Sequence, residues 1–167
     1  MPRLGWAALV PEGVPRSGLG FDVHRFTDGR DLWLGGVRFE GEDGLMGHSD
    51  GDVVCHAIAD ALLGAAALGD VGQHFPEHDP AFEGISGADL LGRVRALLED
   101  AGFAATSCDV TVVCDRPPIA PRRDEMRAAI AGVLRLDVDR CSVKATRPEG
   151  LGLAGDGVGC LAVAVVV

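Results

Sequence analysis

The sequence lacks an excess of basic residues, any pair of cysteines in a C-x-x-C pattern, and any long hydrophobic run. Lys and Arg number 15 against 25 Asp and Glu, so the formal net charge is −10. This charge argues against binding to nucleic acid or to an anionic membrane surface. The apolar segment 161–167 is far shorter than the roughly 20 residues of a membrane-spanning helix, and it predicts a buried strand.

The five cysteines are odd in number and mostly stand among Val, Leu and Ala. This pattern is typical of buried thiols in a reducing compartment, so we expect a cytoplasmic protein. Near the N-terminus, the apolar patch 6–10 is shorter than the core of a signal peptide and is followed by Pro11. We expect residues 1–16 to be an N-terminal extension and residues 17–167 to form a single domain.

Strands and helices alternate along that domain. The apolar spacing predicts strands over 20–26, 32–39, 104–114, 141–146 and 158–167, and helices over 50–68, 87–101 and 122–136. Gly35 and Gly36 indicate a bulge or a hairpin within the second strand segment, and the segment 69–80 is predicted to be irregular. The alternation favours an α/β or α+β domain; we predict an α+β fold in which a single-layer mixed β-sheet packs against helices.

Two histidines and a carboxylate are candidates for a metal site. Asp22 and His24 are two residues apart on a predicted strand, so their side chains should leave the same face of the sheet. On the predicted helix that follows, Asp52, His56 and Asp60 are spaced by four and form a polar stripe, so either carboxylate could hold the second ring nitrogen of His56. As three ligands of a divalent ion, Asp22, His24 and His56 would leave a position open for substrate.

The same residues are compatible with other interpretations. A D-x-H pair on a strand and a His beside Asp on a helix are commonly only polar surface, and an Asp with two His also forms the facial triad of a non-haem iron oxygenase. Ser49 and Asp52 resemble a helix-capping box, so the helix start at His48 and Ser49 could hold an anion or simply be capped. The spacing alone does not decide among these alternatives.

Four segments carry a more specific signal. They are residues 20–26 (GFDVHRF), 47–52 (GHSDGD), 60–72 (DALLGAAALGDVG) and 75–76 (FP). In this order they closely resemble the 2-C-methyl-D-erythritol 2,4-cyclodiphosphate synthases, a similarity that runs from Gly18 to the C-terminus. The resemblance implies conversion of 4-diphosphocytidyl-2-C-methyl-D-erythritol 2-phosphate into the cyclic diphosphate, with release of CMP, in the non-mevalonate isoprenoid pathway. It also implies a homotrimer around a three-fold axis, with an active site at each subunit interface.

The resemblance also implies roles for individual residues. Asp22, His24 and His56 would bind zinc, and Glu149 would hold a second divalent ion, magnesium or manganese, that bridges the substrate's two phosphates. The other implied substrate contacts are His48 and Ser49 beside the diphosphate, Asp70 and Gly72 at the ribose, Phe75, Pro76, Glu77, His78 and Asp79 around the methylerythritol, and Cys114, Pro118, Ile119 and Ala120 in the cytosine-binding loop 114–120.

Catalysis in such a site needs no strong protein base, because the nucleophile is a phosphate oxygen that is already ionised near neutral pH. Positioning and charge stabilisation by metals then carry the reaction. The resemblance implies that His48, Thr146 and the residue at position 147 take part. The family usually has Thr at position 147, whereas this chain has Arg147, so either Thr146 takes the role or the guanidinium supplies charge.

A second departure concerns the three-fold axis. In the family a Phe and an Arg line a cavity there that can hold an isoprenoid diphosphate; Leu153 and Asp156 stand at those positions here. Three copies of Asp156 would repel a diphosphate, so we expect the cavity to lack that ligand or to hold a cation. The changes at positions 147 and 156 are also compatible with an alternative function: a catalytically inactive homologue that still binds a cytidine nucleotide.

Overall fold

The computed structural model of the chain describes residues 13–76, 78–152 and 156–167. Within these ranges a five-stranded sheet has the order β4-β1-β7-β5-β6. Its strands are β1 (Arg16–Thr27), β4 (Gly44–Leu45), β5 (Ala105–Val113), β6 (Cys141–Thr146) and β7 (Gly157–Val166). β5 and β6 are parallel, and the other neighbouring pairs are antiparallel. The predicted α+β class and mixed sheet are confirmed.

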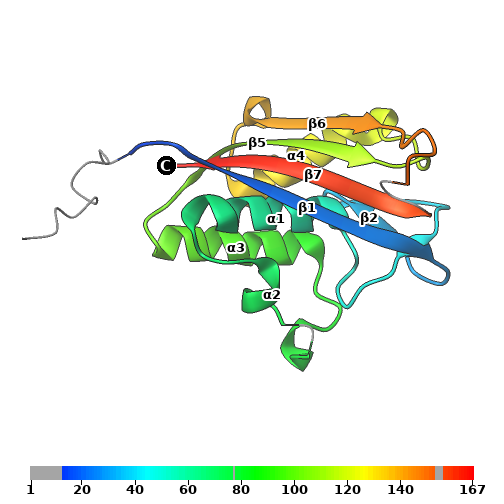
Figure 1. Cartoon of the computed structure of the whole chain (residues 1–167), viewed down its shortest axis with the longest axis horizontal. Helices are drawn as coiled ribbons and strands as arrows, with labels where there is room; N and C mark the ends of the chain where they lie inside the picture. Colours follow the sequence, from blue (N-terminus) through cyan, green and yellow to red (C-terminus); the bar gives the residue numbers. More distant parts are fainter. Residues whose placement is uncertain (1–12, 77, 153–155) are drawn as a thin grey trace, which may run out of the picture.

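The long helices cover one face of this sheet (Figure 1). They are α1 (Val53–Ala66), α3 (Gly87–Asp100) and α4 (Arg123–Leu134). α1 packs against β1 and β7, α4 packs against β6, and α3 contacts both other helices. Each helix turns a stripe of buried aliphatic residues toward the sheet or a neighbouring helix, as the sequence periodicity predicts. Of the described helices, none has the length and apolar character needed to cross a membrane.

The segment 32–39 forms a hairpin outside the main sheet. β2 (Leu32–Leu34) and β3 (Val37–Phe39) pair only with each other. Gly35 and Gly36 make the turn with φ of 61° and 75°, a left-handed conformation that glycine adopts without steric cost. Both N–H groups donate to the Asp52 carboxylate, at 2.8 and 2.7 Å, which holds the hairpin against the start of α1.

Two local predictions were wrong. The helix begins at Val53 and is capped by Asp52, whose carboxylate also accepts from the N–H groups of Val54 and Cys55, so Ser49 does not form a capping box. One fully buried carboxylate thus pairs with four backbone N–H groups, which a serine hydroxyl could not do. The segment 69–80 is partly helical: it contains α2 (Val71–His74) and the start of η2 (Pro80–Phe82), whose first N–H groups are capped by Asp70 and Asp79.

β1 and α1 approach closely because β1 carries glycines on its inner face. A Cβ at Gly20 would lie 1.9 Å from the Ala57 carbonyl oxygen, and one at Gly18 would lie 2.0 Å from that of Ala61. Both contacts are with backbone, which cannot rotate away. This approach places the later residues of β1 beside the first turns of α1.

Gly20→Ala should therefore be destabilising although it adds only a methyl group. We expect a loss of about 1–3 kcal/mol in the free energy of unfolding, because α1 must move away from the sheet. Gly64→Ala is the matched control: Gly64 lies in α1 with open space around it, and alanine there should stabilise the protein by about 0.5–1 kcal/mol. Urea denaturation of both variants measures the difference; equal stabilities would contradict this packing.

The opposite face of the sheet carries no helix of the described chain (Figure 1), and it is apolar where β1 and β7 form it. Leu19, Phe21 and Val23 on β1 are 69%, 51% and 43% exposed, and Leu161 and Val163 on β7 are 40% and 43% exposed. Strand pairing places Leu19 beside Val163 and Phe21 beside Leu161, so these side chains form one patch, called the outer apolar face below. A contiguous apolar area of this kind is typical of a protein interface.

Candidate active site

Asp22, His24 and His56 meet where the end of β1 crosses the first turns of α1. Asp22 Oδ2 accepts from His24 Nε2 at 3.1 Å and from His56 Nδ1 at 3.0 Å. One potential ligand atom from each residue lies within 4.8 Å of the other two, so the three can share one ion. The side chains are only 24%, 25% and 13% exposed, in the order Asp22, His24, His56. The predicted meeting of these three residues is confirmed.

The outer nitrogens of the two rings have their own partners. His56 Nε2 lies 3.1 Å from Ser49 Oγ, which also accepts from the Gly51 N–H at 3.1 Å. His24 makes a further hydrogen bond to the backbone of Met46. The prediction that Asp52 or Asp60 holds the second nitrogen of His56 was wrong. The Asp52 carboxylate accepts from backbone N–H groups instead, and Asp60 accepts from the Val71 N–H at 2.8 Å. Partners of this kind fix the tautomer and orientation of a metal-binding imidazole.

The three side chains form one electrostatic unit. Burial acts to raise the pKa of Asp22, but hydrogen bonds from His24 and His56 outweigh it and hold that pKa well below its usual range. The hydrogen bond to Asp22 raises the pKa of His24 against the opposite effect of burial. An ionised Asp22 presents negative charge between two imidazoles, and this is a charge distribution that attracts a divalent cation.

A cavity of about 230 Å³ opens above the triad. Besides the triad it is lined by His48, Ser49, Gly72 and Phe75, all predicted site residues. Its remaining lining residues, none of them predicted as part of the site, are Asp60, Val71, Phe82, Ile85 and Leu90. Burial raises the pKa of Asp60, partly opposed by the hydrogen bond from Val71. The cavity therefore joins three potential metal ligands to an apolar wall with one further carboxylate.

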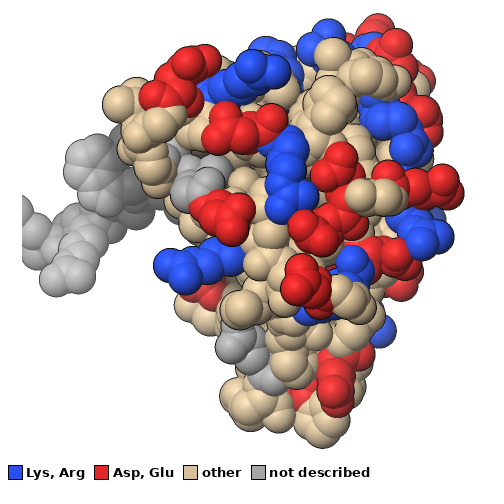
Figure 2. Space-filling model, turned by 90° about the vertical axis from the view of Figure 1, so that its right-hand side faces the viewer, with Lys and Arg blue, Asp and Glu red and all other residues tan. Residues whose placement is uncertain are grey.

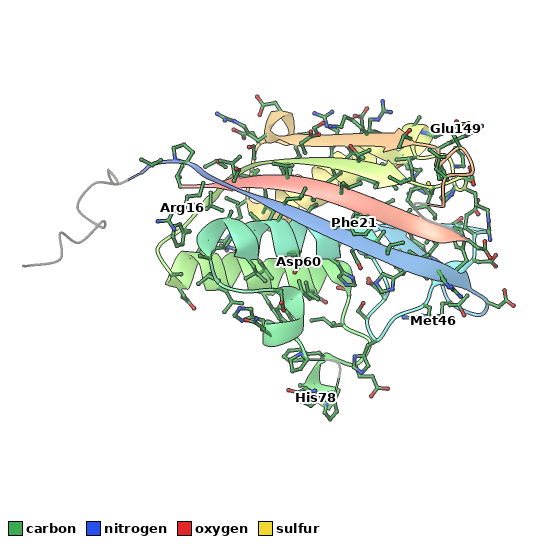
Figure 3. The ribbon with its side chains drawn as sticks, viewed as in Figure 1. Arg16, Phe21, Met46, Asp60, His78 and Glu149 are labelled. Atoms are coloured by element: carbon green, nitrogen blue, oxygen red, sulfur yellow. The ribbon has the colours of Figure 1, made fainter. Side chains whose placement is uncertain are left out.

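A second cavity, of about 380 Å³, lies beyond the ends of β5 and β6. Its lining includes four residues of the predicted cytosine-binding loop, which are Cys114, Pro118, Ile119 and Ala120. It also includes Thr146 and Arg147, the two residues between which the sequence left the catalytic role open. The Cys114 N–H donates to the Thr146 carbonyl at 3.2 Å, which ties the loop to β6. Figure 3 shows Glu149 beside the β6 edge of the sheet, whereas Asp60 lies on α1 next to β1. The predicted site is thus divided between two separate cavities of one chain.

The other predicted site residues lie around these cavities. Asp70 caps α2 through the Gln73 N–H at 2.9 Å, and Pro76 and Asp79 lie in the loop between α2 and η2. His78 lies on that loop, which projects away from the sheet (Figure 3). Asp156 is exposed just before β7, and its carbonyl accepts from the Phe26 N–H. Glu77 and Leu153 are outside the described residues.

The charges near the ends of β5 and β6 are mixed. Figure 2 shows Lys and Arg interspersed with Asp and Glu on the face that lies at the right of Figure 1. Arg116, which follows β5, illustrates the pattern. It pairs with Asp43 at 3.0 Å and with Glu42 at 3.4 Å, and its guanidinium lies 4.0 Å from the centre of the Phe26 ring. This face has no continuous basic area that would follow a nucleic-acid backbone.

Fold and site together define a class: an α+β protein with three side chains that could hold a metal ion at the floor of a cavity, next to an apolar sheet face. The chain matches the model of the YgbB family over residues 15–167. This protein therefore belongs to the YgbB family.

Individual relatives agree with that membership. A 2-C-methyl-D-erythritol 2,4-cyclodiphosphate synthase from Chloroherpeton thalassium is 52% identical over 150 residues, which is 90% of this chain and 96% of the relative. A bifunctional enzyme IspD/IspF from Anaeromyxobacter dehalogenans is 52% identical over 96% of this chain, but the match spans only 42% of that longer relative. A solved 2C-methyl-D-erythritol-2,4-cyclodiphosphate synthase with CDP bound superposes with a TM-score of 0.80 at 35% identity, over 91% of this chain and 99% of that one.

Proposed function

We propose that this protein is a lyase that cyclises 4-diphosphocytidyl-2-C-methyl-D-erythritol 2-phosphate to 2-C-methyl-D-erythritol 2,4-cyclodiphosphate and releases CMP. The observation that carries the proposal is the Asp22, His24 and His56 triad at the floor of a cavity with an apolar wall. Relatives that match over nearly their full length are synthases of this name. The two cavities supply separate places for the two ends of such a substrate.

The donor set of the triad fits zinc. Two imidazoles and one carboxylate are a common set of three protein ligands in catalytic zinc sites, and all three side chains line the cavity, where a substrate could supply the remaining ligand. When bound, zinc would polarise a phosphoryl oxygen of the diphosphate. His48 and Ser49 line the same cavity, so they are placed to donate hydrogen bonds to that diphosphate. Phe75 and its apolar neighbours Val71, Phe82 and Ile85 then enclose the methylerythritol carbons.

The second cavity accounts for the cytidine end of the substrate. Loop 114–120 would hold the cytosine, and Thr146 and Arg147 would lie beside the phosphates, where the hydroxyl donates a hydrogen bond and the guanidinium offsets developing charge. Glu149 follows these residues and is exposed, so it can hold a second divalent ion, magnesium or manganese, that the substrate diphosphate helps to bind. Asp70 and Gly72 complete the substrate contacts at the ribose.

A homotrimer explains why these two half-sites lie apart in one chain. β1 and β6 are separated by β7 and β5, which is roughly 14 Å at about 4.8 Å per strand step. We infer that a substrate touching both half-sites is held between two copies, one supplying the triad and the other supplying loop 114–120. The outer apolar face provides the surface on which the copies meet. Three exposed Asp156 side chains near such an axis would disfavour a bound diphosphate.

Metal removal tests the proposed chemistry. Dialysis against a zinc chelator should lower CMP release by at least about 10³-fold, because three ligands without their ion leave the diphosphate charge uncompensated. Adding back zinc should restore the rate when magnesium is also present. CMP release is followed by chromatography, and CDP binding is measured on the same samples. A protein that binds CDP but releases no CMP with both metals present would instead be the inactive nucleotide-binding homologue.

A further inference from the structure

Arg30 lies in the turn that follows β1, and its guanidinium spans two carbonyl groups of the loop between β4 and α1. Nη1 donates to the Gly47 carbonyl at 2.5 Å, and Nη2 donates to the Ser49 carbonyl. The two acceptors flank His48. Arg30 does not line the cavity above the triad, so its hydrogen bonds reach the site through this loop, while its positive charge also acts on His24 and opposes the rise in that residue's pKa.

The loop held by Arg30 carries the partner of a metal ligand. Ser49 Oγ lies 3.1 Å from His56 Nε2, while His56 Nδ1 faces Asp22. An imidazole that binds a metal through Nδ1 must carry its proton on Nε2, and that proton needs an acceptor. Ser49 supplies the acceptor only while its backbone keeps the hydroxyl oxygen in place.

The other backbone hydrogen bonds of this loop involve other groups than the Gly47 and Ser49 carbonyls. The Met46 N–H donates to the Arg25 carbonyl at 2.9 Å, the Asp50 N–H donates to the Ile85 carbonyl at 3.1 Å, and the Gly84 N–H donates to the His48 carbonyl at 3.0 Å. The carbonyls of Gly47 and Ser49 point to Arg30 instead. A planar guanidinium has donors with fixed directions and can bond both carbonyls at once, whereas a lysine ammonium is a single point charge.

We propose that Arg30 is a positioning residue for the metal site: by holding the carbonyls of Gly47 and Ser49 together it fixes the Ser49 hydroxyl against His56 and so sets the affinity for zinc. The proposal depends on the proposed function in one respect only, namely that the triad binds zinc. It goes beyond that function because it assigns metal affinity to a side chain outside the ligand set and outside the cavity.

The proposal is tested by measuring the zinc affinity of Arg30→Lys and Arg30→Gln. Each variant competes with a chromophoric chelator for zinc, and no substrate is present. We expect both variants to bind zinc about tenfold more weakly, the size typical for lost partners of metal ligands. Lysine keeps the charge but not the two-carbonyl geometry.

At stoichiometric zinc, CMP release by these variants should fall, and excess zinc should restore it, which a general loss of folding would not allow. Arg135→Lys is the control, because Arg135 is exposed and pairs only distantly with Glu99, at 3.7 Å.

A double-mutant cycle separates this mechanism from a simple effect of charge. If Arg30 acts through Ser49, Arg30→Lys combined with Ser49→Ala should weaken zinc binding no more than Ser49→Ala alone. Additive losses, or zinc binding by Arg30→Lys within twofold of the wild type, would overturn the proposal. Melting temperatures identify any variant that is unfolded; the lysine variant decides if the glutamine variant does not fold. Because zinc affinity is measured without substrate, failure of the wild type to release CMP would refute the proposed function and leave this test intact.

Discussion

His56→Ala is expected to lower turnover by at least about 10³-fold while the fold and the assembly remain intact. His56 is one of the three proposed metal ligands, and its removal would leave only Asp22 and His24 to hold the ion. The lost charge stabilisation at the phosphoryl group corresponds to several kcal/mol in the barrier. The backbone around His56 is regular α1, which alanine favours, so the helix should persist. The readouts are CMP release, zinc content per subunit and elution volume.

His74→Ala is the matched control for that variant. His74 ends α2, donates from Nε2 to the Leu68 carbonyl at 2.8 Å, and does not line the cavity above the triad. We expect it to retain zinc and to change turnover by no more than a few-fold. If His56→Ala keeps its zinc and near-normal turnover, the assignment of His56 as a ligand is wrong.

Leu161→Asp is expected to produce monomers and to reduce CMP release by more than about 100-fold. Leu161 is 40% exposed on the outer apolar face, next to Phe21 on β1. In the proposed trimer this position would be buried, and burying an unpaired carboxylate in each subunit costs several kcal/mol. Separation of the copies would divide the triad of one copy from loop 114–120 of the next, so no complete site would remain. Analytical ultracentrifugation gives the mass, and the CMP assay gives the rate.

The isolated monomer offers a sharper expectation. Asp22, His24 and His56 come from one chain, so the Leu161→Asp monomer should still bind zinc while it no longer turns over. Val138→Asp is the control, because Val138 is 42% exposed but lies on η4 (Val138–Arg140), away from the outer apolar face. A monomeric Leu161→Asp protein with full activity would contradict an active site shared between subunits.

Those parts of the fold that depend on local periodicity could be predicted from the sequence. The alternation around Asp22 and His24 and the helical spacing before and after His56 each depend on neighbouring residues, so both elements could be predicted from them. The spacing left open whether the three residues meet, and it was the resemblance to a known family that favoured a shared metal site. Gly35 and Gly36 indicated a bulge or a hairpin in residues 32–39, and the structure has the hairpin. Its separation from the main sheet could not be predicted, because apolar spacing does not identify the partner of a strand. It is the buried Asp52 carboxylate, acting on the Gly35 and Gly36 N–H groups, that places this hairpin against α1.

The surroundings of the triad depend on tertiary contacts that spacing does not encode. Helical spacing pointed to Asp52 and Asp60 as partners of His56, but the loop that precedes α1 folds back and brings Ser49 instead. Phe82, Ile85 and Leu90 are apolar residues in loop and helix contexts, and nothing in their local pattern distinguishes a cavity wall from a core. The resemblance to a known family supplied the division between a diphosphate end and a cytosine end, which residue spacing alone did not provide.

The most direct test of the whole account is ³¹P NMR of the wild-type protein, loaded with zinc and supplied with magnesium, during incubation with 4-diphosphocytidyl-2-C-methyl-D-erythritol 2-phosphate. We predict that the diphosphate and 2-phosphate signals disappear together and that CMP and 2-C-methyl-D-erythritol 2,4-cyclodiphosphate appear in equal amounts. Unchanged substrate signals in the presence of a zinc-loaded protein that still binds CDP would contradict the account, as would CMP release without the cyclic product.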